Sequence, residues 1–496
     1  MKKIYILTAV FALLVFSCLE EPGDYREKSF WATNFSTGND YRLTAELLAE
    51  NSRCEVWVEK GSGVSAATAN AVASEYSGSI YVKLMDVFGW TANYNGGTIN
   101  TMQYADRVLG DGNGKLTILL LDIKDNYKTD GSYVAGYFWM GNFFNVTGSN
   151  QCDMIYVDVN PSKVGSKESY KTFAHEMQHL MNFATTYAFR TTDSAWNSLD
   201  LWIDEGLSSA AEWVYSGEID KNRINWYNAD KTTLISQGDN FYIWDNYSGI
   251  NPNAILNDYA TVNLFFQWLR LQTGIRKTSL NISNNEAAIF FKIITSPKDK
   301  LNYTAITNLM ENSSWQALMQ NWHEANFINH ASSTNGYKNK INVKQKYLNS
   351  NNTIKPLYPG EAVYSYTQSA LSKTGNANIQ YVNLPSANAL LTHNVNTGSY
   401  NSSTGKTEGS TASGEISGIT PPPANIQPSI VDGRSIGYQD QESYQIDAGD
   451  MLRRIGSGRS FFESVQPVSN NQSRNAASSD FKITGELMRY SEFPNE

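Results

Sequence analysis

Cysteine, histidine and positive charge are all scarce in this chain of 496 residues. It has three cysteines and five histidines, so at most one disulfide can form. Lysine and arginine together number 39 against 48 acidic residues, which leaves a formal net charge of -9. Without a basic stripe, a nucleic-acid partner is not expected, and an anionic membrane would repel the protein surface.

Long hydrophobic runs are also rare, and the one at residues 4–16 follows two lysines at the N-terminus. This pattern predicts an export signal over 1–17 and no membrane span, and no transmembrane segment follows it. The end of the run resembles a bacterial lipobox, which implies that Cys18 is lipidated after cleavage. An ordinary secretory signal with an incidental cysteine is the alternative. We expect 18–40 to tether the body to the outer membrane or cell surface through lipid alone.

Two cysteines remain if Cys18 is acylated. Cys54 opens one strand-like run, and Cys152 stands just before another at residues 153–159. Neighbouring strands would bring the two thiols together, and an oxidising compartment could then join them. The sequence therefore predicts at most one disulfide, Cys54–Cys152.

Two of the five histidines fall in one short pattern, His175-Glu176-x-x-His179. Residues four apart on a helix share a face, so both imidazoles can bind one zinc ion. Glu176 is then placed to act as general base. The alternative is two ordinary histidines on a helix. With only five histidines in the chain, the pattern is rarely expected by chance. Apolar residues flank the motif, as an interior helix requires: Tyr170, Phe173, Met177, Leu180 and Met181.

A catalytic zinc site needs a third protein ligand and one open position. Glu205 is the candidate, near the start of a second helical pattern over 201–213. Asp200, Asp204 and Glu212 are competitors, and Glu212, seven residues after Glu205, is better suited to supporting a ligand. Glu205 could instead be only a carboxylate favoured by the helix dipole.

The run Trp-Ile-Asp-Glu-Gly-Leu at 202–207 resembles the third-ligand segment of the gluzincin zinc peptidases. Together with His-Glu-Met-Gln-His-Leu-Met-Asn-Phe, it most closely resembles the hyicolysin-type bacterial metallopeptidases. The resemblance implies one catalytic Zn²⁺ held by His175, His179 and Glu205, and hydrolysis of peptide bonds. The 25 residues between His179 and Glu205 form a longer connection than is typical of the clan.

Hydrolysis also needs a donor to the oxyanion that forms on the carbonyl. Tyr259 is the candidate, because its segment resembles the helix that carries a catalytic tyrosine in the aminopeptidase branch of the clan. With 29 tyrosines in the chain, a packed core tyrosine is the alternative. His323 and His330 are further alternatives for the same role.

The segments 115–123 and 153–159 are expected to be buried strands. Between them, Gly136, Tyr137, Phe138 and Trp139 are expected on an exposed edge strand that pairs with an extended substrate. An aromatic strand in the sheet interior is the alternative.

The composition changes near residue 345, where helical patterns give way to short alternating runs rich in Asn, Ser, Thr and Gly. We predict an α+β protein with a zincin-like metallopeptidase domain over 41–345. That domain would have a mixed sheet with an edge strand, an active-site helix and a helical lower subdomain. Residues 346–496 are expected to form a β-sandwich-like accessory domain with a mobile loop near 398–428.

The sequence thus predicts a zinc endopeptidase that cleaves extracellular or surface proteins and peptides by Glu176-assisted attack of water. The rival hypothesis is a non-catalytic surface adhesin, or a carbohydrate- or protein-binding lipoprotein, with 346–496 as its binding surface. The intact His175, Glu176 and His179 argue against this second hypothesis. Nothing in the sequence specifies an oligomeric state.

Overall fold

The structure of the protein is a computed structural model. It describes residues 26–89, 111, 113–130, 132–143, 147–186, 190, 197–328, 336–348, 354–367, 372–384, 388–417 and 483–489. The expected signal at 1–17, Cys18 and His330 lie outside this part of the chain. Within it, no helix combines the length and hydropathy needed to cross a membrane.

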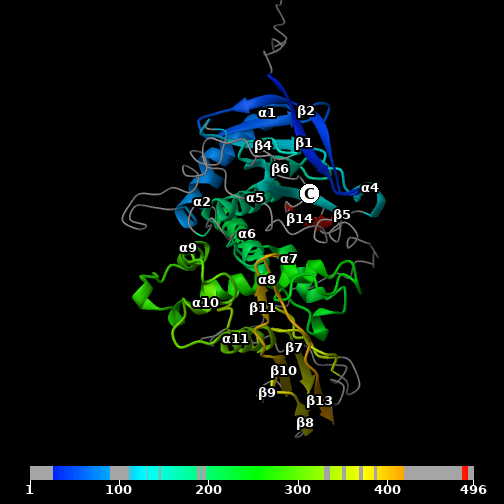
Figure 1. The fold of residues 1–496 in the computed structure, drawn as a ribbon, viewed down its shortest axis with the longest axis vertical. Helices are drawn as coiled ribbons and strands as arrows, with labels where there is room; N and C mark the ends of the chain where they lie inside the picture. Colours follow the sequence, from blue (N-terminus) through cyan, green and yellow to red (C-terminus); the bar gives the residue numbers. More distant parts are fainter. Residues whose placement is uncertain are drawn as a thin grey trace, which may run out of the picture.

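A mixed sheet lies at one end of the molecule (Figure 1). In the described residues its spatial order is β1-β2-β3-β4-β6-β5-β14. The strands are β1 Glu27–Asn34, β2 Asn39–Glu50, β3 Cys54–Glu59, β4 Leu116–Leu121, β5 Ser132–Trp139, β6 Met154–Asp158 and β14 Ile483–Arg489. β3, β4 and β6 run parallel, and the remaining neighbours pair antiparallel.

The central strands β4 and β6 are buried along their whole length. Strands covered on both faces need near-continuous apolar sequence, and Leu-Thr-Ile-Leu-Leu-Leu and Met-Ile-Tyr-Val-Asp supply it except at Thr117 and Asp158. The prediction of two buried strands in these segments is confirmed. The sheet core continues into the helical half of the molecule, where one apolar cluster includes Leu119, Met177, Trp202 and Phe266.

Most helices form the middle of the molecule, whereas α1 and α4 lie at the sheet end, where they contact the strands (Figure 1). They are α1 Ala66–Glu75, α2 Tyr81–Val87, α4 Tyr127–Asp130, α5 Lys167–Thr185, α6 Leu201–Ser216, α7 Lys221–Ala229, α8 Ile255–Leu271, α9 Ala288–Ile294, α10 Thr304–Thr307 and α11 Trp315–Ile328. α5 contacts β5 and β6, and α6 packs against both α5 and α8. α5 and α6 therefore lie side by side beneath the sheet.

Short strands follow, yellow and orange in Figure 1; most lie at the far end of the molecule, whereas β11 lies near α8 and β12 contacts α6. They are β7 Ala362–Tyr366, β8 Ser372–Gly375, β9 Ile379–Leu384, β10 Ala389–Asn394, β11 Ser399–Asn401, β12 Lys406–Glu408 and β13 Gly414–Ser417. Three sheets result, in the orders β7-β10-β9, β11-β12 and β13-β8. The chain is thus a mixed α+β protein, and the sandwich-like arrangement of its C-terminal part stays a prediction.

Two segments expected to lack regular structure contain strands. β1 lies within the expected tether at 18–40, because residues 27–34 pair with β2 along their full length. The expected mobile loop at 398–428 contains the β11–β12 hairpin and β13. Thr407 fixes this hairpin, since its N–H and hydroxyl both donate to the Asp200 carboxylate at the start of α6. Residues 418–428 lie outside the described part of the chain.

β5 is not the exposed edge strand that the sequence predicts, and whether Gly136, Tyr137, Phe138 and Trp139 contact a substrate stays a prediction. β5, which carries Gly136 to Trp139, lies between β6 and β14, so both of its sides are paired. β14 comes from the region assigned to the accessory domain, and it pairs with β5 in the first sheet. Sequence periodicity could not anticipate this, because the two strands are separated by more than 340 residues.

The expected disulfide is also absent, because Cys54 and Cys152 are both free and buried. Cys54 begins β3 and Cys152 precedes β6, but β4 lies between these two strands. Two strand spacings of about 4.8 Å exceed the Cα separation that a disulfide spans. Burial raises the pKa of the Cys54 thiol to about 11.

A buried carboxyl group connects the helical half to the C-terminal strands. Glu361 is 1% exposed and accepts hydrogen bonds from Tyr358 N (2.8 Å), Tyr247 OH (3.2 Å) and Asn246 Nδ2 (3.2 Å). Burial raises its pKa to about 7, although these donors partly oppose the shift. Folding therefore holds the proton on Glu361 to a higher pH than the unfolded chain does.

This shift predicts how stability depends on pH. A carboxyl whose pKa is higher in the folded state stabilises the fold below its unfolded pKa, and that contribution is lost as pH rises through about 7. This contribution to the free energy of unfolding is up to about 3 kcal/mol. We expect Glu361→Gln to lose less stability than wild type between pH 5 and pH 8, measured by urea unfolding of zinc-free protein. Equal losses in the two proteins would contradict the prediction.

Candidate metal centre

Helix α5 carries both motif histidines and is fixed at its start by a side-chain cap. Ser166 Oγ accepts from Ser169 N at 3.1 Å, which satisfies one of the free N–H groups of the first turn. His175 and His179 lie one turn apart on the helix, and both are at most 1% exposed. The helix therefore directs two imidazoles into the protein interior.

Helix α6 supplies the carboxylate. Glu205 lies in its second turn and is 3% exposed. The helix ends at Gly217, whose φ of 71° is the left-handed conformation that glycine adopts readily. At its start, Leu201 N donates to Gly405 O, so the β11–β12 hairpin also holds α6 in place.

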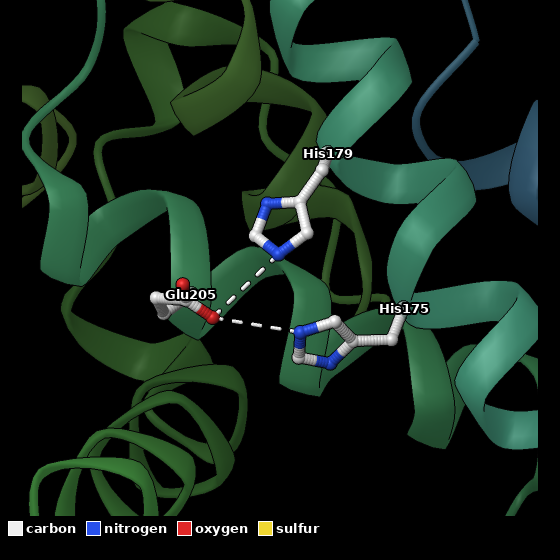
Figure 2. A group of neighbouring side chains, drawn as sticks. All are labelled: His175, His179 and Glu205. Carbon is white, nitrogen blue, oxygen red and sulfur yellow. Dashed lines mark ion pairs between the residues drawn. The ribbon is translucent and has the colours of Figure 1, made fainter. Parts of the chain in front are cut away.

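Figure 2 shows the two imidazoles and the Glu205 carboxylate pointing toward one another. Glu205 Oε2 lies 3.5 Å from His175 Nε2 and 3.6 Å from His179 Nε2. Ligands about 2 Å from a tetrahedral zinc ion lie about 3.4 Å apart, so these separations fit the metal. Among the described residues, neither His179 Nε2 nor Glu205 Oε2 has a hydrogen-bond partner. The structure thus brings the three predicted ligands together as a group that could hold one ion.

The Nδ1 side of the His175 ring contacts the Glu212 carboxylate, which in turn is bound by Arg223. His175 Nδ1 lies 2.8 Å from Glu212 Oε1, which also accepts from Arg223 Nη2 at 3.2 Å. A carboxylate at Nδ1 fixes the ring orientation and directs Nε2 to the metal position. Glu212 therefore supports a ligand, and its bond to Nδ1 explains why it is not the third ligand itself.

The His179 ring is held in a similar way. Its Nδ1 lies 3.1 Å from Asp204 Oδ1 and 3.2 Å from Ser208 Oγ. Asn182 Nδ2 donates to the same Asp204 oxygen at 2.8 Å. Asp204 is thus engaged behind the ring, and Asp200 is engaged with Thr407, so neither competitor approaches the metal position through these contacts.

The electrostatics of the group match a cation site. Burial alone would raise the pKa of Glu205, but His179 and His175 hold it well below its usual range. Burial alone would lower the pKa of His179, but Asp204 and Glu205 raise it to about 10. Glu212 also has a lowered pKa, because Arg223 and His175 outweigh the effect of burial. Ionised carboxylates therefore surround two imidazoles in a buried position, which favours a positive charge between them.

The expected base, Glu176, follows His175 on α5 and is fully buried. It lies against β5: a β-carbon on Gly136 would stand 3.1 Å from Glu176 Cγ and 2.9 Å from Tyr156 O. Only glycine at position 136 allows β5 to approach α5 this closely. The backbone of β5 therefore forms the wall beside the expected base.

Two candidates for the oxyanion donor, Tyr259 and His323, lie in the described part of the chain. The Tyr259 ring packs edge-on to Trp244, with centroids 5.2 Å apart, and the Arg223 guanidinium lies 5.1 Å from it. Through Arg223 and Glu212 it is connected to His175, and its catalytic role stays a prediction. His323 Nε2 bonds Gly360 O at 2.9 Å and faces the C-terminal strands.

Sequence reasoning missed several residues that build the site. Arg223, Ser208 and Asn182 act behind the ligands, and each is an ordinary polar residue with no motif of its own. Gly206 is different, because it follows Glu205 in the resembling Glu-Gly pair. A β-carbon there would overlap the Phe266 ring on α8, so glycine permits the close packing of α6 on α8.

No protein-family profile matches this chain. The chain is similar to the neutral metalloprotease ShpI of Staphylococcus hyicus, at 28% identity over 276 residues. The matched segment makes up 54% of this chain and 55% of that relative, so the chain spans about half the length of the protein it matches. Together with the His175, His179 and Glu205 group, this similarity supports a metallopeptidase in general terms, with zinc as the metal.

Glu212→Gln tests the support behind His175. Removing the charge at Oε1 weakens the interaction that orients the ring, and we expect zinc affinity to fall by about 10–100-fold. Competition with a chromophoric chelator measures the change. Glu218→Gln is the matched control. Glu218 is exposed just after the end of α6, where it pairs with Lys167, so this variant should bind zinc like wild type. Wild-type affinity in both variants would contradict this role.

Gly206→Ala tests the packing of α6 on α8. The added methyl group overlaps the Phe266 ring, so we expect destabilisation by about 1–3 kcal/mol, measured by thermal unfolding. Phe266→Leu in the same chain restores space and should recover part of the loss. If Gly206→Ala melts like wild type, the close approach does not constrain the helix.

Proposed function

We propose that this protein is a zinc-dependent endopeptidase that hydrolyses peptide bonds in extracellular or surface proteins. The observation that carries the proposal is the buried convergence of His175, His179 and Glu205, with ligand atoms 3.5 and 3.6 Å apart. The similarity to a neutral metalloprotease over half the chain supports the same class of reaction. The motifs further favour the hyicolysin type among the gluzincins.

In this proposal His175, His179 and Glu205 hold the zinc ion. When bound, zinc supplies Lewis acidity, which polarises the substrate carbonyl and lowers the pKa of a water molecule toward about 7. Glu176 accepts the proton of the attacking water and later delivers it to the leaving amine. Tyr259 is the proposed donor to the oxyanion.

The residues behind the ligands prepare this chemistry. Glu212 and Asp204 each accept the Nδ1 proton of one imidazole, so both Nε2 atoms are left for the metal. Burial of His175, His179, Glu205 and Glu212 limits their contact with bulk water and strengthens their electrostatic interactions. Gly136 lets the β5 backbone lie beside Glu176, which is where a substrate carbonyl would have to be presented.

The place of action is proposed from the sequence. The apolar run at 4–16 and the lipobox-like end support export and lipidation at Cys18. The acidic surface supports membrane attachment through lipid alone. The rival function, a non-catalytic adhesin that uses 346–496, is disfavoured by an intact ligand group with oriented imidazoles.

Glu176→Gln tests the proposed function. Removing the base should reduce hydrolysis of a mixed casein digest by about 10²–10⁴-fold, while the three ligands still bind zinc. Peptide release and zinc content are measured on the same samples. Glu168→Gln, on the exposed first turn of α5, is the matched control and should retain activity. Equal hydrolysis by Glu176→Gln and wild type would remove Glu176 as the base.

A further inference from the structure

The side of β5 that faces away from β6 is occupied by a strand from the C-terminal end of the chain. β14 pairs antiparallel with β5 from Ile483 opposite Trp139 to Arg489 opposite Ser132. β6, by contrast, pairs with β5 only at Gly136 and Tyr137 in the described residues. β14 is therefore the main hydrogen-bonding partner of β5.

β14 passes close to the candidate site. Glu486 is the register partner of Gly136, and Gly136 is the residue whose added β-carbon would stand 3.1 Å from Glu176 Cγ. Adjacent strands lie about 4.8 Å apart, so β14 runs one strand spacing from the wall beside the expected base. β14 also contacts α5 (Figure 1, where β14 is red). The C-terminal strand thus lies along the metal-binding helix.

The ladder is regular on one side of this point and irregular on the other. Residues 483–486 pair in register with 136–139, and the register then shifts between Glu486 and Leu487, so that Ala135 has no register partner. A bulge of this kind interrupts the ladder and bends the strand that carries it. The regular pairs involve residues 136–139 of β5, beside which an extended peptide would pass the site.

We propose that residues 483–489 act as an internal occupant of the peptide-binding side of β5, so that an extended peptide substrate binds there only after β14 withdraws. This proposal rests on the proposed peptidase function. One side of a strand can pair with only one partner, and a strand added there offers the same main-chain donors and acceptors as an extended peptide. β14 and the substrate therefore compete for the same backbone groups.

The competition is intramolecular. A segment on the same chain binds at an effective concentration set by the connecting residues, so the occupancy of β5 does not depend on protein concentration. In the sequence, 65 residues separate Ser417 from Ile483, and the entropic cost of closing a loop grows only slowly with its length. Free peptide is consequently a weak competitor against the intact chain.

Full-length protein tests the proposal. Successive N–H groups of a strand point to opposite sides, so Thr484→Pro with Gly485→Pro must remove one donor that faces β5. Thr484→Ala with Gly485→Ala keeps both donors and is the matched control. The probe is a fluorescein-labelled peptide with the sequence of residues 482–490, and its binding is measured by anisotropy in zinc-loaded chains that also carry Glu176→Gln.

We expect the proline variant to bind the peptide at least ten-fold more tightly than wild type, and the alanine variant to bind like wild type. Without Glu176→Gln, the proline variant should hydrolyse an extended quenched peptide with kcat/KM raised at least ten-fold, mainly through KM. Unchanged peptide binding would overturn the proposal. If peptide binding rises but no variant hydrolyses peptides, the peptidase function is wrong and the occupancy of β5 by β14 stands.

A second variant decides the matter if the proline chain does not fold. Phe138 and Thr484 are register partners, so Phe138→Cys with Thr484→Cys should cross-link β5 to β14 on oxidation. Peptide binding should then be lost and should return on reduction with dithiothreitol. Failure of the cross-link to form, or peptide binding that is unaffected by it, would show that β14 does not occupy β5.

Discussion

The packing of α5 against α6 is the constraint on which the candidate metal centre depends. Two imidazoles come from one helix and the carboxylate from the other, so the ligand atoms converge only if the helices keep their separation and rotation. Gly206 allows α6 to approach α8, and Asp200 ties the start of α6 to the β11–β12 hairpin. Parts of the chain on either side of the site therefore fix its geometry.

Buried charge is the second constraint. The buried Glu205 and Glu212 and the partly exposed Asp204 surround two buried imidazoles, and an isolated buried carboxylate would be strongly disfavoured. Arg223 offsets part of this charge behind Glu212, and a divalent cation between the three ligands would offset the rest. The same arrangement fixes the orientation of both rings, so the site is organised before any substrate binds.

The sequence predicted the site better than it predicted the surroundings of the site. His175, Glu176 and His179 form one short pattern whose spacing follows from helix geometry. Glu205 is predicted instead from its place near the start of a second helical pattern and from the resemblance of 202–207 to a third-ligand segment. Arg223, Ser208 and Gly206 act through contacts between helices, and no single-chain pattern specifies which helices meet.

The errors concern strand neighbours. Periodicity identified β4, β5 and β6 as strands but could not give their order, so Cys54 and Cys152 were expected side by side although β4 separates their strands. Pairing between residues as distant as Trp139 and Ile483 leaves no local signal in either segment. β11 and β12 pair locally, but Thr407 holds this hairpin to Asp200, which lies far away in the sequence, so composition alone predicts a mobile loop there.

The zinc coordination sphere is the most direct test of the central claim. X-ray absorption at the zinc edge of the metal-loaded protein should show one ion per chain with two imidazole nitrogens and oxygen ligands at about 2.0–2.1 Å, and no sulfur. Glu205→Ala should lower the coordination number or the metal content. A spectrum that requires sulfur ligands, or one that Glu205→Ala leaves unchanged with zinc fully bound, would contradict the account.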